Sequence, residues 1–197
     1  HICMSGEPQV GTVYKESQSG GRQMKDIFKF AFILGLIALS AGGLLAAVNA
    51  VTAPRIAAQA GLEEEAALKG LQPEAAVFTP VLKGDTVFFY KAYDKNDKLL
   101  SVLFKAAGKG YSGMIETMVC MDVQAKIKAI KVLSQNETPG LGSKVAEGSF
   151  TGRFSGVDAA RVSGVQAITG ATISSRAVSS SIALKAAEVR EALRNGK

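Results

Sequence analysis

The residues best suited to chemistry lie in the run T-G-A-T-I-S-S, residues 169–175, ahead of the last helical pattern in the sequence. A glycine followed by small hydroxyl residues at a helix start leaves backbone N–H groups exposed at the positive end of the helix dipole, where a phosphate binds well. Thr172 adds a nucleophilic hydroxyl at the same place. The alternative is an ordinary helix start capped by Ser174 or Ser175, because serine and threonine are common caps.

Two glycine-rich stretches precede this run, G-K-G-Y-S-G at 108–113 and E-T-P-G-L-G at 137–142. Either can be a simple turn between elements. The first has the letters of a dinucleotide-binding G-x-G-x-x-G, but the segment after it is strand-like and no βαβ unit surrounds it, so this chemistry is excluded. Glycines at this density do let a planar ligand approach the backbone closely.

The composition argues against several other chemistries. His1 is the only histidine, so the sequence offers no histidine metal site and no Ser-His triad. Cys3 and Cys120 are far apart and have no metal-binding or C-x-x-C spacing, and we interpret Cys120 as a small buried hydrophobe in a strand. The net charge of +6 is scattered and tryptophan is absent. Nothing therefore indicates a nucleic-acid partner.

A segment of 22 uncharged residues, 30–51, is long enough to cross a bilayer as a helix. Arg22, Lys25 and Lys29 precede it and the acidic run 63–65 follows it. The positive-inside rule therefore places the N-terminus in the cytoplasm and the rest of the chain outside. A cleaved signal peptide is the competing interpretation, but the length favours a retained anchor.

The pattern after the span predicts the elements that position the chemical residues. Pro54 is interpreted as the end of the span, residues 57–71 as helical, and the stretch between Pro73 and Pro80 as a connection. Strand-like runs then predict two hairpins, 86–92 with 99–106 and 115–123 with 126–133. The remaining predictions are a short helix at 143–148, two short extended pieces within 158–169, and an amphipathic C-terminal helix from Ser175.

These motifs occur in one order between Met24 and the end: one span, the two glycine loops, and T-G-A-T-I-S-S before a helix. In this arrangement the chain resembles the FMN-binding domain family of the RnfG protein of the Rnf complex and the NqrC protein of the sodium-translocating NADH:quinone reductase. Its length is closer to that of the Rnf protein. The resemblance implies that Thr172 carries FMN through a phosphoester. The family pattern usually has an acidic residue where this chain has Gln166.

The resemblance also implies the fold and the site. The expected fold class is α+β, with one N-terminal transmembrane helix followed by an extracytoplasmic domain that has an antiparallel sheet and a C-terminal helix. The expected boundaries are a flexible leader 1–23, an anchor 24–53, a helical linker 54–75 and a covalent FMN-binding domain 76–197. The implied cofactor-binding residues are Thr169, Gly170, Ala171, Thr172, Glu137, Thr138, Leu141, Gly142, Gly110 and Tyr111.

The function implied by the resemblance is electron transfer within an ion-translocating ferredoxin:NAD+ oxidoreductase of a bacterial or archaeal membrane. The chain would be one component of that complex and not a stand-alone catalyst. Its implied partners are membrane and iron–sulfur subunits, and a flavin transferase during maturation. Two alternatives stay open: the equivalent component of the quinone reductase, and a non-redox anchored scaffold or binding module in which T-G-A-T only caps a helix.

Overall fold

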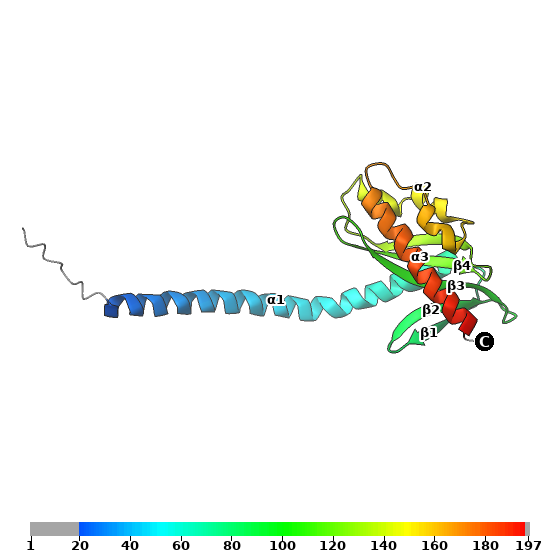
Figure 1. Ribbon diagram of the computed structural model, residues 1–197. Helices are drawn as coiled ribbons and strands as arrows, with labels where there is room; N and C mark the ends of the chain where they lie inside the picture. The colour runs from blue at the N-terminus through cyan, green and yellow to red at the C-terminus, as the bar shows by residue number, and fades with distance from the viewer. Residues whose placement is uncertain (1–19, 196–197) are drawn as a thin grey trace, which may run out of the picture. The chain divides into compact units, whose positions relative to one another are not determined.

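The computed structural model describes residues 20–195, and the side chains of residues 27–195 (Figure 1). The chain divides into two units, residues 1–56 and residues 57–197, and helix α1 (Gly20–Leu71) runs from the first into the second. Of the predicted leader, residues 1–19 lie outside the described part, and residues 20–23 are the first turn of α1.

Helix α1 is the one helix in the described part of the chain that is long and apolar enough to cross a membrane. It does not end at Pro54, so the predicted break between the span and residues 57–71 is wrong. A proline removes only its own N–H donor and strains one carbonyl, and the helical hydrogen bonds on both sides of it can persist. Proline is also tolerated in membrane helices.

The second unit is built on a five-stranded antiparallel sheet in which each strand pairs with its neighbour in sequence. Both predicted hairpins are confirmed, and the structure joins them into one continuous meander. The strands are β1 (Val77–Lys83), β2 (Thr86–Tyr93), β3 (Leu99–Lys109), β4 (Met114–Asp122) and β5 (Ile127–Ser134).

Strand β1 occupies the stretch that was expected to be a connection up to Pro80. Pro80 lies within the strand and is paired with Tyr90 of β2. Because β1 is at the edge of the sheet, a residue without an N–H donor can be accommodated on its outer side. A proline therefore marked an edge strand here, and the expected connection was wrong.

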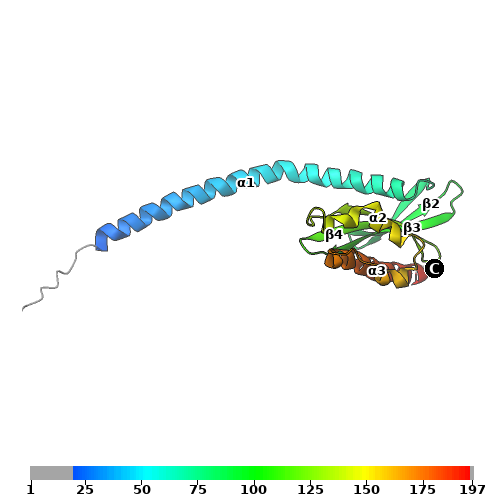
Figure 2. The same ribbon diagram turned by 90° about the horizontal axis from the view of Figure 1, so that it is seen from above.

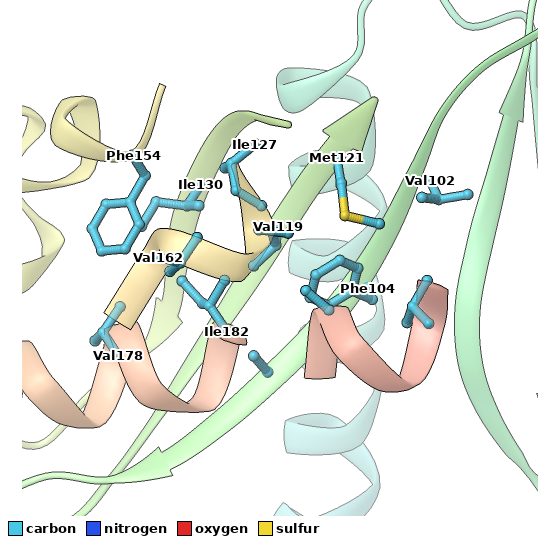
Figure 3. Close-up of a cluster of buried hydrophobic side chains, with 14 of the residues drawn as sticks. Val102, Phe104, Val119, Met121, Ile127, Ile130, Phe154, Val162, Val178 and Ile182 are labelled. Carbon is cyan, nitrogen blue, oxygen red and sulfur yellow. The ribbon is translucent and has the colours of Figure 1, made fainter. Parts of the chain in front are cut away.

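One face of the sheet is covered by helix α3 (Thr172–Asn195) and a series of short helices (Figure 2). The short helices are η1 (Gly142–Ala146), α2 (Gly148–Thr151), η2 (Gly152–Phe154) and η3 (Ala159–Gly164). Figure 3 shows Val119 and Ile130 of the sheet facing Val178 and Ile182 of α3 in the core between these layers. This core fixes α3, and with it the T-G-A-T run, against the sheet.

The opposite face of the sheet packs against the end of α1 within the same unit. Leu103, Met118 and Cys120 form a second buried cluster with Ala67 and Leu68. Cys120 is 0% exposed, which confirms its interpretation as a buried small hydrophobe.

A polar contact beside the second cluster also ties the end of α1 to the sheet. Glu64 accepts a hydrogen bond from the Tyr90 hydroxyl at 3.0 Å and pairs with Lys105 Nζ at 3.0 Å. Burial, and then the contact with Glu64, raise the pKa of Tyr90 to about 12.

The stretch 158–169 does not contain two extended pieces as predicted, because the 3-10 helix η3 occupies much of it. Asp158 caps this helix by accepting a hydrogen bond from the Ala160 N–H at 2.8 Å. An aspartate in this position satisfies a free amide of the first turn and starts a helix. The predicted short helix at 143–148 is present as η1 followed by α2.

Helix α3 crosses strand β3 so closely that only glycine fits at residue 108. A Cβ on Gly108 would overlap the Ala177 carbonyl oxygen and would lie 3.1 Å from Ser181 Cβ. The side-chain-free surface at this point allows the N-terminal half of α3 to lie directly on the sheet.

Gly108→Ala is expected to lower the free energy of unfolding by about 1–3 kcal/mol, because α3 or β3 must shift to admit the methyl group. Thermal unfolding of the detergent-solubilised chain, followed by circular dichroism, measures this change. Gly152→Ala is the matched control, since a Cβ there meets nothing within 4 Å. Equal stability of Gly108→Ala and the wild type would contradict the close approach.

Candidate functional site

Three loops meet at the N-terminal end of α3 and enclose a groove of about 420 Å³, within the range of ligand pockets. They are the β3–β4 loop, the segment 137–142 and the segment 170–172. The groove is lined by Tyr111, Glu137, Thr138, Leu141, Gly142, Gly170, Ala171, Thr172, Ile173 and Ser174. The structure thus brings together all the predicted site residues except Thr169 and Gly110.

A larger groove of about 630 Å³ lies at the other end of α3, against the β1–β2 hairpin. Phe88, Phe89 and Leu193 form its apolar part, with charged side chains of both signs around them. None of the predicted site residues lines it. It adjoins the C-terminal end of a helix, whose dipole disfavours a bound anion.

Thr172 is the first residue of α3 and its side chain is exposed. The preceding residue, Ala171, provides the carbonyl that accepts the first helical hydrogen bond, from the Ser175 N–H at 2.9 Å. Alanine has no side-chain acceptor, so the residue before the helix does not cap the amides of the first turn. Gly170 turns the chain into the helix with a φ of +81°, a conformation that strains any other residue.

Ser174 and Ser175 do not cap the helix, because both lie inside its first turn and are buried. The Ser174 hydroxyl donates to Glu137 Oε2 at 2.5 Å. Ser175 Oγ accepts from the Ile168 N–H at 3.0 Å. Both hydroxyls bond the helix start to neighbouring segments, so the alternative of an ordinary serine cap is wrong.

The Glu137 carboxylate holds the loops together. It is 6% exposed, and besides Ser174 it accepts backbone N–H bonds from the β3–β4 loop. The donors are Tyr111 at 3.2 Å, Ser112 at 2.9 Å and Gly113 at 3.3 Å. One side chain therefore connects the β3–β4 loop, its own loop and the first turn of α3.

Glu137 is held as an anion. Burial alone would raise its pKa, but the hydrogen bonds from Ser174 and from the three loop amides together outweigh burial and lower it below the ordinary value. A carboxylate that accepts several N–H bonds is stabilised in its charged form. Glu137 is therefore a structural anion of the site and carries no proton to donate near neutral pH.

The glycines of the two loops make room for this carboxylate. A Cβ on Gly110 would lie 2.5 Å from Glu137 Oε1, and one on Gly142 would lie 2.7 Å from Oε2. Gly110 is buried behind Glu137 and does not line the groove, so the expectation that it leaves room for a ligand is corrected. Gly140, with a φ of +76°, forms the turn of its loop.

The outer wall of the groove is apolar. Tyr111 is 72% exposed, Leu141 52% and Ile173 56%. Ile173 and Ser174 were missing from the predicted set, because the helix was expected to begin at Ser175 and it begins three residues earlier, at Thr172. Thr169 is exposed beside Gly170 but outside the groove. The wall offers a surface for a planar apolar group next to the uncapped helix start.

Gln166, which stands where an acidic residue is usual, is exposed. Its backbone carbonyl accepts a hydrogen bond from Arg153 Nη1 at 2.9 Å. No cluster of histidine, cysteine or carboxylate side chains suited to a metal ion occurs within residues 20–195. The arrangement is suited to holding a phosphate-bearing planar ligand rather than to acid–base chemistry on a substrate.

The chain matches two known families and several characterised relatives. The FMN-binding domain family matches residues 110–185, and the RnfG N-terminal region matches residues 21–71. One relative is a subunit of the proton-translocating ferredoxin:NAD(+) oxidoreductase complex of Clostridium ljungdahlii, 30% identical over 82% of this chain and 90% of that protein. Another is a subunit of the Na(+)-translocating ferredoxin:NAD(+) oxidoreductase complex of Acetobacterium woodii, also 30% identical, over 80% and 89%.

Among solved structures, NqrC of Shewanella oneidensis is similar with a TM-score of 0.45 and 22% identity, over 57% of this chain and 66% of that one. The relatives cover both the N-terminal helix and the domain with the groove. This protein belongs to the RnfG family of Rnf-type ion-translocating oxidoreductase complexes, and its second unit contains the FMN-binding domain.

Proposed function

We propose that FMN is joined through its phosphate to Oγ1 of Thr172, and that the chain passes electrons through this flavin within an ion-translocating ferredoxin:NAD+ oxidoreductase complex. The observation that carries the proposal is the exposed Thr172 hydroxyl at an uncapped helix start, inside a groove formed by three loops. Family membership supports the complex, and the FMN-binding domain supports the flavin.

The phosphate end of the cofactor fits the start of α3. The residue before Thr172 is alanine, so the free amides of the first turn have no side-chain acceptor there. The helix dipole adds about 0.3–1 kcal/mol for an anion at this end. A phosphoester on Thr172 would put its charge where these groups favour it.

The ring end fits the apolar wall. Tyr111, Leu141 and Ile173 are exposed in the structure, and a flat aromatic ring placed against them would bury apolar surface on both partners. Thr138 and the backbone of Gly142 supply polar groups beside that wall. When bound, FMN supplies the electron-transfer chemistry, and the residues of this chain hold and orient it.

Two features distinguish this proposal from its alternatives. A scaffold whose T-G-A-T only caps a helix would use Ser174 or Ser175 as the cap, yet both hydroxyls are bonded elsewhere. The relatives named as components of ferredoxin:NAD(+) oxidoreductases favour this complex over a quinone reductase. The proposed partners are the other subunits of the complex, including an iron–sulfur subunit, and a flavin transferase that forms the ester.

The apolar helix and the family together indicate a membrane location. We place the anchor at residues 24–53 and the FMN-binding domain on the extracytoplasmic side. Basic residues before the span and acidic residues after it support this orientation. A flavin on that side gains from a covalent bond, because a dissociated cofactor would diffuse away.

Thr172→Ala is expected to abolish covalent flavin attachment, because it removes the oxygen that forms the ester. The chain is co-expressed with a flavin transferase and run on a denaturing gel under ultraviolet light. The wild type and the matched control Ser163→Ala, at an exposed hydroxyl residue outside the groove, should fluoresce, and Thr172→Ala should be dark. A fluorescent Thr172→Ala band would contradict the assignment.

Glu137→Gln is expected to lower the free energy of unfolding at pH 7 by about 1–3 kcal/mol, because an acceptor-only carboxylate is replaced by an amide that also carries donors. The folded-state pKa of Glu137 is lowered, so its stabilisation is present above the unfolded value of about 4.3 and is lost as the pH falls through the lower folded value.

Urea unfolding at a series of pH values measures this effect. The difference between the wild type and Glu137→Gln should be full above about pH 5 and shrink below about pH 4. Glu147→Gln, at an exposed carboxylate, is the control and should change little. A pH-independent difference would show that the charge of Glu137 is not what holds the loops.

The proposed orientation predicts that Val123→Cys, at a residue 57% exposed in the β4–β5 turn, reacts with a membrane-impermeant maleimide in intact spheroplasts. The test uses a Cys3→Ser background, and the buried Cys120 should stay unlabelled. Lys25→Cys should react only after the membrane is opened. Labelling with the opposite sidedness would overturn the orientation.

A further inference from the structure

We propose that Arg176 binds the phosphate through which the flavin is attached, and so provides the positive charge that the groove itself lacks. The inference rests on the proposed attachment at Thr172. It concerns a residue outside the groove lining and outside the predicted site set.

A cation beside the groove would add to the attraction that the helix start already has for a phosphate. Among the described residues, Glu137 is the only charged one that lines the groove, and it is an anion. A phosphodiester on Thr172 would bring a second negative charge into the same small space. The repulsion between two such charges is larger where water is partly excluded, and a nearby positive charge would offset it.

Arg176 is placed to supply that charge. It follows Thr172 by four residues on α3, and residues so spaced lie next to each other on one helix face. Helical side chains lean toward the N-terminus, so the surface that Arg176 covers lies over the turn that begins at Thr172. Thr172, Ile173 and Arg176 are exposed, whereas Ser174 and Ser175 between them are buried.

Nothing in the described part of the chain engages the Arg176 guanidinium. No hydrogen bond or ion pair of residues 27–195 involves it. The first turn of α3 contains no acidic residue. The Arg176 side chain therefore forms no hydrogen bond or ion pair with the described residues that would stabilise the empty domain, and its position suits a bound anion.

The guanidinium matches a phosphate in geometry as well as charge. Its planar fork donates two parallel N–H bonds to two oxygens, which a lysine ammonium cannot do. Lys109, within the first glycine-rich stretch, and Lys144, just after the second, are also exposed, but neither lies on the α3 face that carries Thr172. Lys144 is therefore the matched control, because it carries a positive charge but does not lie on the α3 face of Thr172.

The test is a double-mutant cycle on the full chain in detergent, after co-expression with a flavin transferase. Wild type, Arg176→Ala, Thr172→Ala and the double variant are compared by thermal unfolding, with flavin content measured from in-gel fluorescence. With the flavin attached, Arg176→Ala should lower the Tm by about 3 °C. In the Thr172→Ala background the same change should leave the Tm unchanged or raise it.

Three companion measurements sharpen the result. Arg176→Lys should recover only part of the Tm, because it keeps the charge and loses the fork. Lys144→Ala should leave the Tm of the flavin-bearing chain near that of the wild type. The phosphorus NMR resonance of the attached phosphodiester should shift in Arg176→Ala and stay in place in Lys144→Ala.

The outcomes separate this inference from the proposed function. If Arg176→Ala lowers the Tm equally with and without Thr172→Ala, Arg176 acts only on the stability of the fold, and the inference is overturned. An unchanged flavin-bearing Arg176→Ala chain, or an equal effect of Lys144→Ala, would also overturn it. A wild-type band without fluorescence would instead show that no flavin is attached, and both the proposed function and this inference would fail.

Discussion

The site depends on one buried carboxylate. Glu137 accepts hydrogen bonds from the amides of the β3–β4 loop and from the hydroxyl of Ser174, so three segments distant in sequence share one anion. Gly110 and Gly142 leave the space in which the carboxylate lies. Without that carboxylate the loop amides would lose their acceptor, and the three segments would lose the group that joins them.

The rest of the second unit presents Thr172 to solvent while fixing its position. Three residues at the helix start are buried: Ala171, Ser174 and Ser175. The apolar stripe of α3 packs on the sheet, so the sheet side of the helix start is fixed in place. The close contact at Gly108 brings the helix backbone onto β3. Thr172 is therefore an exposed hydroxyl on a rigid support, which is what an attachment site for a large cofactor requires.

Much of this could be predicted from sequence where the signal is local. Alternating apolar residues predicted the two hairpins, and the apolar stripe predicted the C-terminal helix, although that helix begins at Thr172 and not at Ser175. Predictions from local sequence were wrong where contacts between distant segments determine the structure. Pro80 lies in an edge strand, Pro54 lies inside a continuous helix, and Gly110 makes room for Glu137 instead of a ligand. The bond between Glu137 and Ser174 joins residues 37 positions apart, and no spacing in the sequence reveals it.

The central claim is that Thr172 bears the flavin, and mass spectrometry of the tryptic peptide 162–176 tests it most directly. Fragmentation of this peptide can assign the modified oxygen among its hydroxyl residues, which are Ser163, Thr169, Thr172, Ser174 and Ser175. The account predicts a peptide heavier by FMN less one water, with the added mass on Thr172. An unmodified peptide from flavin-bearing protein, or the added mass on any of the other hydroxyl residues, would contradict it.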